Sequence, residues 1–430
     1  MMLLEVNSVK EICINGEENG ISRESLESAL EELLSQYSGL KKVLIIPPDY
    51  TRCYSYAGII TQILCAKLKG VHVDVMPALG THMPMSEEEI RLFFGDAVAP
   101  EKIIVHRWQT DTIKLGYVPA DFCAEISGGL FPEQIDVEVN HRLFDGGYDL
   151  ILSPGQVVPH EVVGMANYSK NIFVGTGGRE MINKSHMLSA ICGLEKALGV
   201  RDTPARKAYD YAQEHFIDGK IPLVYIQTVT TTEGEDVTLR GLFIGQSRKP
   251  FEMAAELSQK LNIFHLNRRA KKVVTYLEPS ELKTTWVGNK GVYRTRMIVD
   301  DGGELLVLGP GIRAFGENDE MDAMTRKYGY KGTPYILDLY RKGAFEGRLM
   351  SAAHLMQGSS EGRFTITYAT KPELMTRGEI ESVGYNWADY DEITKRYDPF
   401  KLKEGWNVMD DGEEIYFVGK PATGLWKYDG

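Results

Sequence analysis

Three groups of polar side chains follow short apolar runs in the first half of the chain. Asp49, Thr51 and Arg52 follow VLII, His82 follows VDVM, and His160 follows DLIL. In open α/β sheets, ligands bind beyond the carboxyl ends of strands, so these residues are the first candidates for a site. A guanidinium can grip a carboxylate or phosphate, and an imidazole exchanges protons near neutral pH. Acid–base chemistry on an anion is one interpretation; a capped turn and backbone-bonded loop histidines are the other.

A denser group of reactive residue types lies between His160 and His186. It contains Lys170 and glycines at 175, 177 and 178. A desolvated lysine can attach a cofactor covalently, and a glycine-rich turn can present backbone donors to a phosphate, although these glycines lack the order of a Walker or dinucleotide motif. Together with His82, the two histidines could also form an open zinc site, but their spacing matches no closed metal motif.

Apolar runs and helical patterns alternate around these residues. Buried strands are predicted at 43–46, 73–76, 102–105 and 149–152, with helices at 23–37 and 57–69. Ser86 followed by Glu89 predicts a capping box at the start of another helix. This alternation predicts an α/β domain with a largely parallel sheet.

Further strand candidates extend along the second half of the chain. They begin near residues 223, 241, 272, 297 and 304. We therefore predict two α/β domains with largely parallel sheets, an N-terminal one over 1–265 that carries the site motifs and a C-terminal one over 266–430. The run EIYFVG lies in a tail, 400–430, that could return to the N-terminal domain.

Composition excludes several classes of protein. With 430 residues, 43% hydrophobic and 25% charged, the chain is neither disordered nor fibrous, and a net charge of -12 without a basic run argues against nucleic acid as a partner. Acidic residues interrupt the N-terminus before a signal-peptide core could form, and no run is long enough to span a membrane, so we expect a cytoplasmic protein. The five cysteines are odd in number and lack CxxC spacing, which predicts thiols buried by packing.

Taken in order, the motifs resemble the nickel-dependent lactate racemase family. The resemblance covers most of the chain. It rests on three short motifs, DYTR, GTHMPM and PHEVVG. It also rests on a lysine ten residues after the histidine of PHEVVG, a histidine sixteen residues after that lysine, and a weaker match near Lys290. In this sequence these elements are Asp49, Tyr50, Thr51 and Arg52, then His82, His160, Lys170 and His186.

The resemblance implies a fold with an active-site cleft between two domains, and an isomerase that inverts C2 of a 2-hydroxy acid. It implies a pyridinium-3,5-bisthiocarboxylic acid mononucleotide pincer joined to Lys170, with nickel held by the pincer and His186, and separate maturation enzymes that build it. One of His82 and His160 would take the hydroxyl proton while hydride moves reversibly to the pincer. The cofactor contacts it implies are Asp49, Tyr50, Thr51, Arg52, Lys170, His186 and Lys290. The carboxylate of the substrate would be held by Arg52 and Lys290, one from each domain.

The chain departs from the lactate racemase pattern just before Lys290. Where that pattern has a tyrosine, a serine and a glutamine, this chain has Trp286 to Asn289. Trp286 brings a larger apolar wall, and the polar Asn167, Tyr168 and Asn289 suggest a longer substrate. We therefore expect a 2-hydroxy acid other than lactate, with a sugar acid such as gluconate as the leading candidate. The alternative is that these residues repack the same small site for lactate or another short-chain acid.

Two alternatives come from other classes of protein. A zinc-dependent hydrolase would use the three histidines and grip an acidic substrate with Arg52. A non-enzymatic two-domain protein would capture an anion. Surface or structural roles are expected for the remaining candidates, Trp108, Lys114, His72, His106, His141, His215 and His354.

Overall fold

A computed structural model describes residues 9–234 and 236–430 of the chain. The chain divides into two units, each with its own sheet. The first runs to Leu188 and resumes from Gly199 to Asn262, and the second contains Ser189–Leu198 and Ile263–Gly430. The division expected near residue 265 did not include the short segment from Ser189 to Leu198. The tail 400–430 lies in the second unit.

The first unit is built on a six-stranded sheet that is parallel at its centre. Its strands, in spatial order, are β1 (Ile12–Asn15), β10 (Asp236–Gly245), β9 (Leu223–Glu233), β6 (Leu150–Gln156), β2 (Lys42–Ile45) and β3 (His72–Val75). Strands β9, β6, β2 and β3 pair in parallel, whereas β1 and β10 add antiparallel pairs at one edge. The strand candidates near 223 and 241 thus belong to this first sheet.

The strand predicted at 102–105 is wrong. Pro100 opens a short 3₁₀ helix, η3 (Pro100–Lys102), and only Ile103 bridges to Val75. Proline fixes its own φ near the turn value and has no N–H for a ladder, so this segment begins as a turn and not as a strand.

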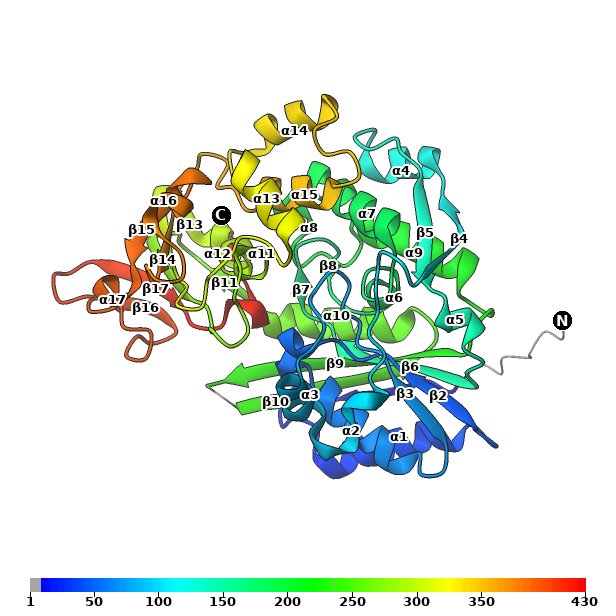
Figure 1. Cartoon of the computed structure of the whole chain (residues 1–430). Coiled ribbons are helices and arrows are strands. Elements are labelled where there is room, and N and C mark those ends of the chain that lie inside the picture. Colours follow the sequence, from blue (N-terminus) through cyan, green and yellow to red (C-terminus); the bar gives the residue numbers. More distant parts are fainter. Residues whose placement is uncertain (1–8, 235) are drawn as a thin grey trace. The chain divides into compact units, whose positions relative to one another are not determined.

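Helices cover both faces of the first sheet (Figure 1). α1 (Arg23–Ser35), α2 (Ala57–Lys67) and α3 (Glu87–Phe94) pack on one face, and α10 (Lys249–Asn262) lies on the other. On the first face, Leu26, Leu30 and Leu33 of α1 join Val43 and Ile45 of β2 in one buried cluster. The predicted capping box is confirmed, since Ser86 and Glu89 exchange side-chain-to-backbone bonds at 2.8 and 3.2 Å.

Further elements lie between these strands and helices along the chain. They are η1 (Tyr50–Ser55), η2 (Gly95–Ala97), β4 (Thr112–Val118), α4 (Ala120–Ser127), β5 (Ile135–Asn140), α5 (Arg142–Asp145), β7 (Pro159–His160), β8 (Gly164–Met165), α6 (Ser169–Phe173), α7 (Arg179–Cys192) and α9 (Pro204–Phe216).

The second unit contains another six-stranded sheet. Its order is β15 (Asn386–Asp389), β14 (Thr365–Thr370), β13 (Val299–Leu308), β12 (Ala270–Tyr276), β17 (Glu414–Val418) and β16 (Gly405–Val408). These strands pair in parallel apart from β16 with β17, so the prediction of an α/β fold with largely parallel sheets is confirmed. The candidates near 297 and 304 form one strand, β13, which follows a 3₁₀ turn, η4 (Arg296–Ile298).

The remaining elements of the second unit complete its helical cover and a small parallel pair. The pair joins β11 (Ile263–Leu266) to β18 (Leu425–Tyr428). The helices are α8 (Leu194–Ala197), α11 (Thr285–Gly288), α12 (Lys290–Thr295), α13 (Asp319–Tyr328), α14 (Thr333–Arg341), α15 (Leu349–Gln357), α16 (Arg377–Ser382), α17 (Tyr390–Ile393) and η5 (Pro421–Thr423).

Two expectations from composition can be compared with the structure. All five cysteines lie among the described residues and are free thiols. Cys123 is buried, Cys53, Cys65 and Cys192 are half-buried, and the expectation of burial is wrong for the exposed Cys13. Of the helices in the described ranges, none combines the length and apolarity needed to cross a membrane.

Candidate active site

The Asp49 carboxylate orients His82 at the end of the first sheet. Asp49 follows β2, caps η1 and is only 5% exposed. Its Oδ1 accepts bonds from the backbone N–H and the hydroxyl of Thr51 at 2.9 and 2.5 Å, and its Oδ2 lies 2.6 Å from His82 Nδ1. Because an ionised carboxylate only accepts hydrogen bonds, His82 donates through Nδ1 and keeps its lone pair on Nε2. His82 is therefore set as a base.

The loop that carries His82 is held against the Lys170 segment. Gly80 donates its N–H to the carbonyl of Gly175 at 2.9 Å and adopts a positive φ of 57°. A side chain at Gly80 would be strained in this conformation, so the turn depends on glycine. The imidazole of His82 remains 29% exposed, which leaves it accessible to a ligand.

His160 has the opposite arrangement of donor and acceptor. It ends β7 and is only 5% exposed. Its Nδ1 accepts the backbone N–H of Val162 at 3.1 Å, so the neutral ring carries its proton on Nε2, which lies 3.8 Å from Glu161 Oε1. Of the two histidines expected near the hydroxyl proton, His82 is therefore set as an acceptor and His160 as a donor.

Lys170 lies on α6, which is fastened to the carboxyl ends of two strands. The amide of Asn171 donates to the carbonyl of Ile46, just after β2, and to the hydroxyl of Ser153 on β6, at 3.1 and 2.8 Å. These two bonds place Lys170 at the edge of the sheet where ligands of parallel α/β proteins bind.

His186 on α7 presents one nitrogen suited to a metal. Its Nδ1 donates to the carbonyl of Ile182 at 2.7 Å, so Nε2 carries the lone pair. Burial, with a smaller contribution from the positive charge of Lys170, outweighs the bond to Ile182 and the charge of Glu161 and lowers the pKa of the imidazole to about 4. The ring is therefore neutral at pH 7, the form that binds metals.

The side chains near His186 indicate which kind of metal site is compatible with the structure. Within residues 9–234 and 236–430, no group of three or more His, Cys, Asp or Glu side chains is arranged to hold a metal ion. This finding argues against the zinc site expected from His82, His160 and His186. A single neutral histidine beside a lysine fits a metal whose other ligands belong to a group attached to the protein.

The glycine cluster after Lys170 is used for packing, not for a phosphate. Gly175, Gly177 and Gly178 donate their N–H groups to carbonyls of Lys170, Val174 and Glu138. An added Cβ would lie 2.3, 1.9 and 2.4 Å from neighbouring atoms at these three positions. The backbone donors that a phosphate would need are therefore already bonded within the protein.

Arg52 and Tyr50 differ in what surrounds them. The backbone of Arg52 departs from the 3₁₀ conformation within η1, at φ -120° and ψ 36°, and its side chain is partly exposed. The ring of Tyr50 packs edge-on against Phe93 at 6.3 Å between centroids. Arg52 is available to an anion, whereas the ring of Tyr50 contributes to the packing of α3.

Trp286 and Lys290 lie in the second unit. Trp286 stacks on His354 at 4.2 Å between centroids, and His354 is held by the hydroxyls of Tyr293 and Tyr330 at 2.8 and 2.7 Å. Lys290 begins α12 and is 5% exposed. His354 therefore has the structural role expected of it, because its ring packs against the indole of Trp286.

The three polar residues that suggested a long substrate are committed to the interior. Asn289 accepts from Tyr368 at 2.6 Å and donates to Tyr385 at 3.1 Å. Asn167 donates to the carbonyl of Gly155 at 2.8 Å, and Tyr168 is 3% exposed. The motivation for a sugar acid from these residues is therefore wrong.

The fold and the site define an α/β protein with an oriented histidine base at the carboxyl edge of a parallel sheet. Residues 3–197 match the family model described as the lactate racemase N-terminal domain. Over these residues the match confirms the resemblance seen in the motifs. Trp286 and Lys290 lie outside the matched residues.

Solved structures share the fold over nearly the whole chain. A crystal structure of a Thermotoga maritima protein has 25% sequence identity and a TM-score of 0.84, covering 97% of this chain and 100% of that one. The lactate racemase apoprotein from Thermoanaerobacterium thermosaccharolyticum has 16% identity and a TM-score of 0.66, covering 96% and 91%. At 16% the likeness shows the fold alone. No curated protein matches the chain.

Proposed function

We propose that this protein is a racemase or epimerase that inverts C2 of a 2-hydroxy acid with a nickel pincer nucleotide. The observation that carries the proposal is the bond from His186 Nδ1 to Ile182, because it leaves Nε2 to ligate a metal close to the Lys170 charge. The match to the lactate racemase N-terminal domain supports the same reading.

Lys170 would hold the pyridinium mononucleotide through a thioamide, and His186 would be the protein ligand of nickel. When bound, that group supplies the acceptor for the C2 hydride of the substrate. Maturation enzymes would build it. We keep three further residues as proposed cofactor contacts, Asp49, Tyr50 and Thr51. Asp49 also orients His82, and Thr51 holds the Asp49 carboxylate.

The chain itself handles the hydroxyl proton. His82 Nε2 takes the proton, and the Asp49 carboxylate stabilises the imidazolium that forms. The Nε2–H of His160 donates a hydrogen bond to the substrate oxygen and keeps its proton, because Nδ1 already accepts the N–H of Val162. For His160 to act as the base through Nε2, that backbone bond must break, so His82 is the residue arranged to act as the base.

The carboxylate of the substrate needs a cation. Arg52 is partly exposed and offers a planar fork for two parallel hydrogen bonds. Lys290 stays a proposed second partner on the strength of the sequence resemblance.

The expected substrate has a side chain larger than methyl. Trp286, held by His354, replaces the tyrosine of the lactate pattern with a wider apolar surface. The protein, matured in a host that supplies the cofactor, should invert phenyllactate at least about tenfold faster than lactate, which corresponds to about 1.4 kcal/mol. Chiral analysis of lactate, malate, phenyllactate and gluconate measures this. Turnover of lactate alone would contradict it.

His186→Ala should lose nickel and keep the organic adduct on Lys170. The matured wild type should carry an adduct on Lys170 with near-stoichiometric nickel, and the variant the adduct with nickel reduced at least about tenfold, because one protein ligand is gone. Intact mass and metal analysis measure both.

His215→Ala is the matched control for this experiment. His215 also lies on a helix and makes the same Nδ1 bond to a carbonyl four residues earlier, at 2.8 Å, but it is exposed. Its removal should leave the nickel content unchanged. A wild type with zinc and an unmodified Lys170 would favour the hydrolase, and one with neither adduct nor metal would favour the anion-binding protein.

A further inference from the structure

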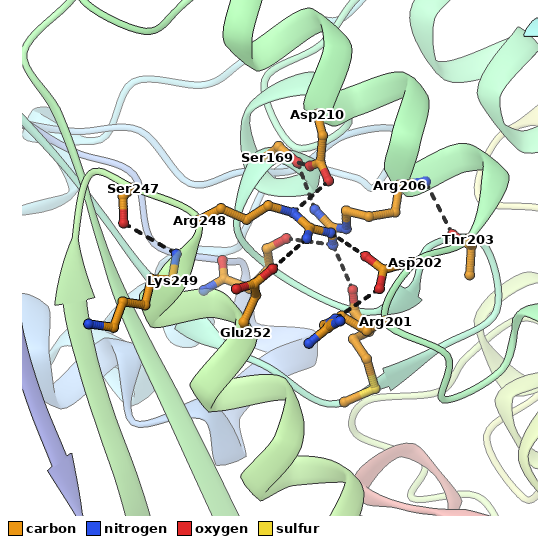
Figure 2. A network of polar contacts seen from close by, with 12 residues as sticks. Ser169, Arg201, Asp202, Thr203, Arg206, Asp210, Ser247, Arg248, Lys249 and Glu252 are labelled. Atoms are coloured by element: carbon orange, nitrogen blue, oxygen red, sulfur yellow. Dashed lines mark hydrogen bonds and ion pairs between the residues drawn. The ribbon is translucent and has the colours of Figure 1, made fainter. Parts of the chain in front are cut away.

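Arg206 holds the turn that leads into Lys170 (Figure 2). The side chain comes from α9 and is fully buried. Its Nη1 donates to the hydroxyl of Ser169 at 2.7 Å, and its Nη2 donates to the carbonyls of Met165 and Asn167 at 2.7 and 3.1 Å. One planar group thus fixes the first, third and fifth residues before Lys170.

The turn that Arg206 grips is strained. Asn167 and Tyr168 have positive φ values of 63° and 54°, a region that L-residues other than glycine rarely adopt. Such a conformation persists only where the surroundings impose it. Gly155 makes room for it, because an added Cβ there would lie 2.7 Å from Asn167 Oδ1.

Aromatic packing supports the same turn from the side. The ring of Tyr168 stacks on Phe251 at 5.2 Å and lies 4.6 Å from Tyr225, between centroids. The guanidinium of Arg206 lies 4.5 Å from the centroid of Phe251. The turn is therefore held both by the aromatic rings and by the guanidinium, which meet at Phe251.

Asp210 and Arg248 form a chain of polar contacts that orients the hydroxyl of Ser169. The Ser169 hydroxyl donates to Asp210 Oδ1 at 2.9 Å, and Asp210 Oδ2 accepts from Arg248 at 3.0 Å (Figure 2). Arg248 also pairs with Glu252 at 2.7 Å. The residue next to Lys170 is thus coupled to both α9 and α10.

Burial of the Arg206 guanidinium costs desolvation free energy, so a contribution to stability does not explain why an arginine stands here. Burial lowers the pKa of the Arg206 guanidinium, and among the described atoms its Nε has no hydrogen-bond partner. Buried charges add little net stability compared with apolar side chains of similar size. What Arg206 supplies is geometry: three bonds converge on the backbone and hydroxyl groups just before one lysine.

We propose that Arg206 is the positioning residue that sets the Lys170 backbone for covalent attachment of the cofactor. This inference rests on the proposed function for the role of Lys170. Arg206 contacts neither substrate nor cofactor in this scheme and acts through residues 165–169.

Arg206→Lys and Arg206→Met test the inference with two measurements. The first is amide hydrogen exchange of residues 164–172 in the protein without cofactor, which should become at least about tenfold faster in both variants while β6 is unchanged. The second is the fraction of Lys170 carrying the adduct after maturation, which should fall at least about fivefold in folded Arg206→Lys, because an ammonium cannot reproduce the planar fork.

Arg201→Lys and Arg201→Met are the matched controls. Arg201 belongs to the same charged network through Asp202 and Glu256 but does not contact the turn. Both measurements should stay at wild-type values. Ser169→Ala removes one of the three acceptors and should give an intermediate loss, which keeps the inference testable if the Arg206 variants fail to fold.

The outcomes separate this inference from the proposed function. Unchanged exchange and full adduct in Arg206→Lys would overturn it, as would faster exchange spread over the whole first unit. If the wild type carries no adduct while a control racemase matures normally, the proposed function fails. The exchange measurement then still decides whether Arg206 holds the turn.

Discussion

Lys170→Arg is expected to abolish both the covalent adduct and racemase activity. A guanidinium preserves the positive charge near His186 but cannot form the thioamide, so the variant separates attachment from electrostatics. We expect no adduct by intact mass and a loss of more than about 10³-fold in kcat, since the group that accepts hydride would have no covalent link.

Lys184→Arg is the matched control for this loss. Lys184 lies on α7, two residues before His186, and donates to the carbonyl of Gln134 at 2.8 Å. It should keep the adduct and activity within about twofold, as surface substitutions usually do. Full activity in matured Lys170→Arg would refute attachment at this lysine and the pincer proposal with it.

Asp49→Asn is expected to reduce kcat on the order of 10³-fold by reversing the His82 tautomer. Both donors of Thr51 bond to Oδ1, so that atom must remain an oxygen in the variant. The amide NH₂ would then face His82 Nδ1, which would become an acceptor. The remaining ring proton would move to Nε2, and the base would be lost while the fold and the adduct remain.

The chain offers a close control for this tautomer argument. Asp429 pairs with His265 Nδ1 at 2.6 Å, the same separation as in the Asp49 pair, but both side chains are exposed. Asp429→Asn should leave kcat unchanged. ¹⁵N shifts of labelled histidine should show the His82 tautomer reverse only in Asp49→Asn. Activity within threefold of the wild type would show that His82 is not the base.

Local patterns in the sequence predicted most elements around the site. The apolar runs that became β2 and β6 are continuous because these strands are buried on both faces, and the Ser86 capping box is a short-range signal. The run at 102–105 failed because Pro100 imposes a turn that a count of apolar residues does not register.

Long-range contacts could not be predicted in the same way. Asp49 and His82 are 33 residues apart, and nothing in either loop marks them as partners. Arg206 lies 36 residues after Lys170 in an ordinary helical pattern, so the sequence did not indicate that it contacts the turn before Lys170. The same limit led to error at Asn167, Tyr168 and Asn289, whose polar side chains are buried and bonded internally.

By itself the sequence determined the kind of fold, the order of its reactive residues and the family model that residues 3–197 match. These depend on residue types and on spacing along the chain. Only the tertiary structure decided which nitrogen of each histidine carries a proton, that the glycines pack instead of binding phosphate, and that Arg206 grips the Lys170 turn. Each of these depends on hydrogen bonds that form only in the folded chain. Some join residues far apart, such as Asp49 and His82, and others join near neighbours, such as Val162 and His160.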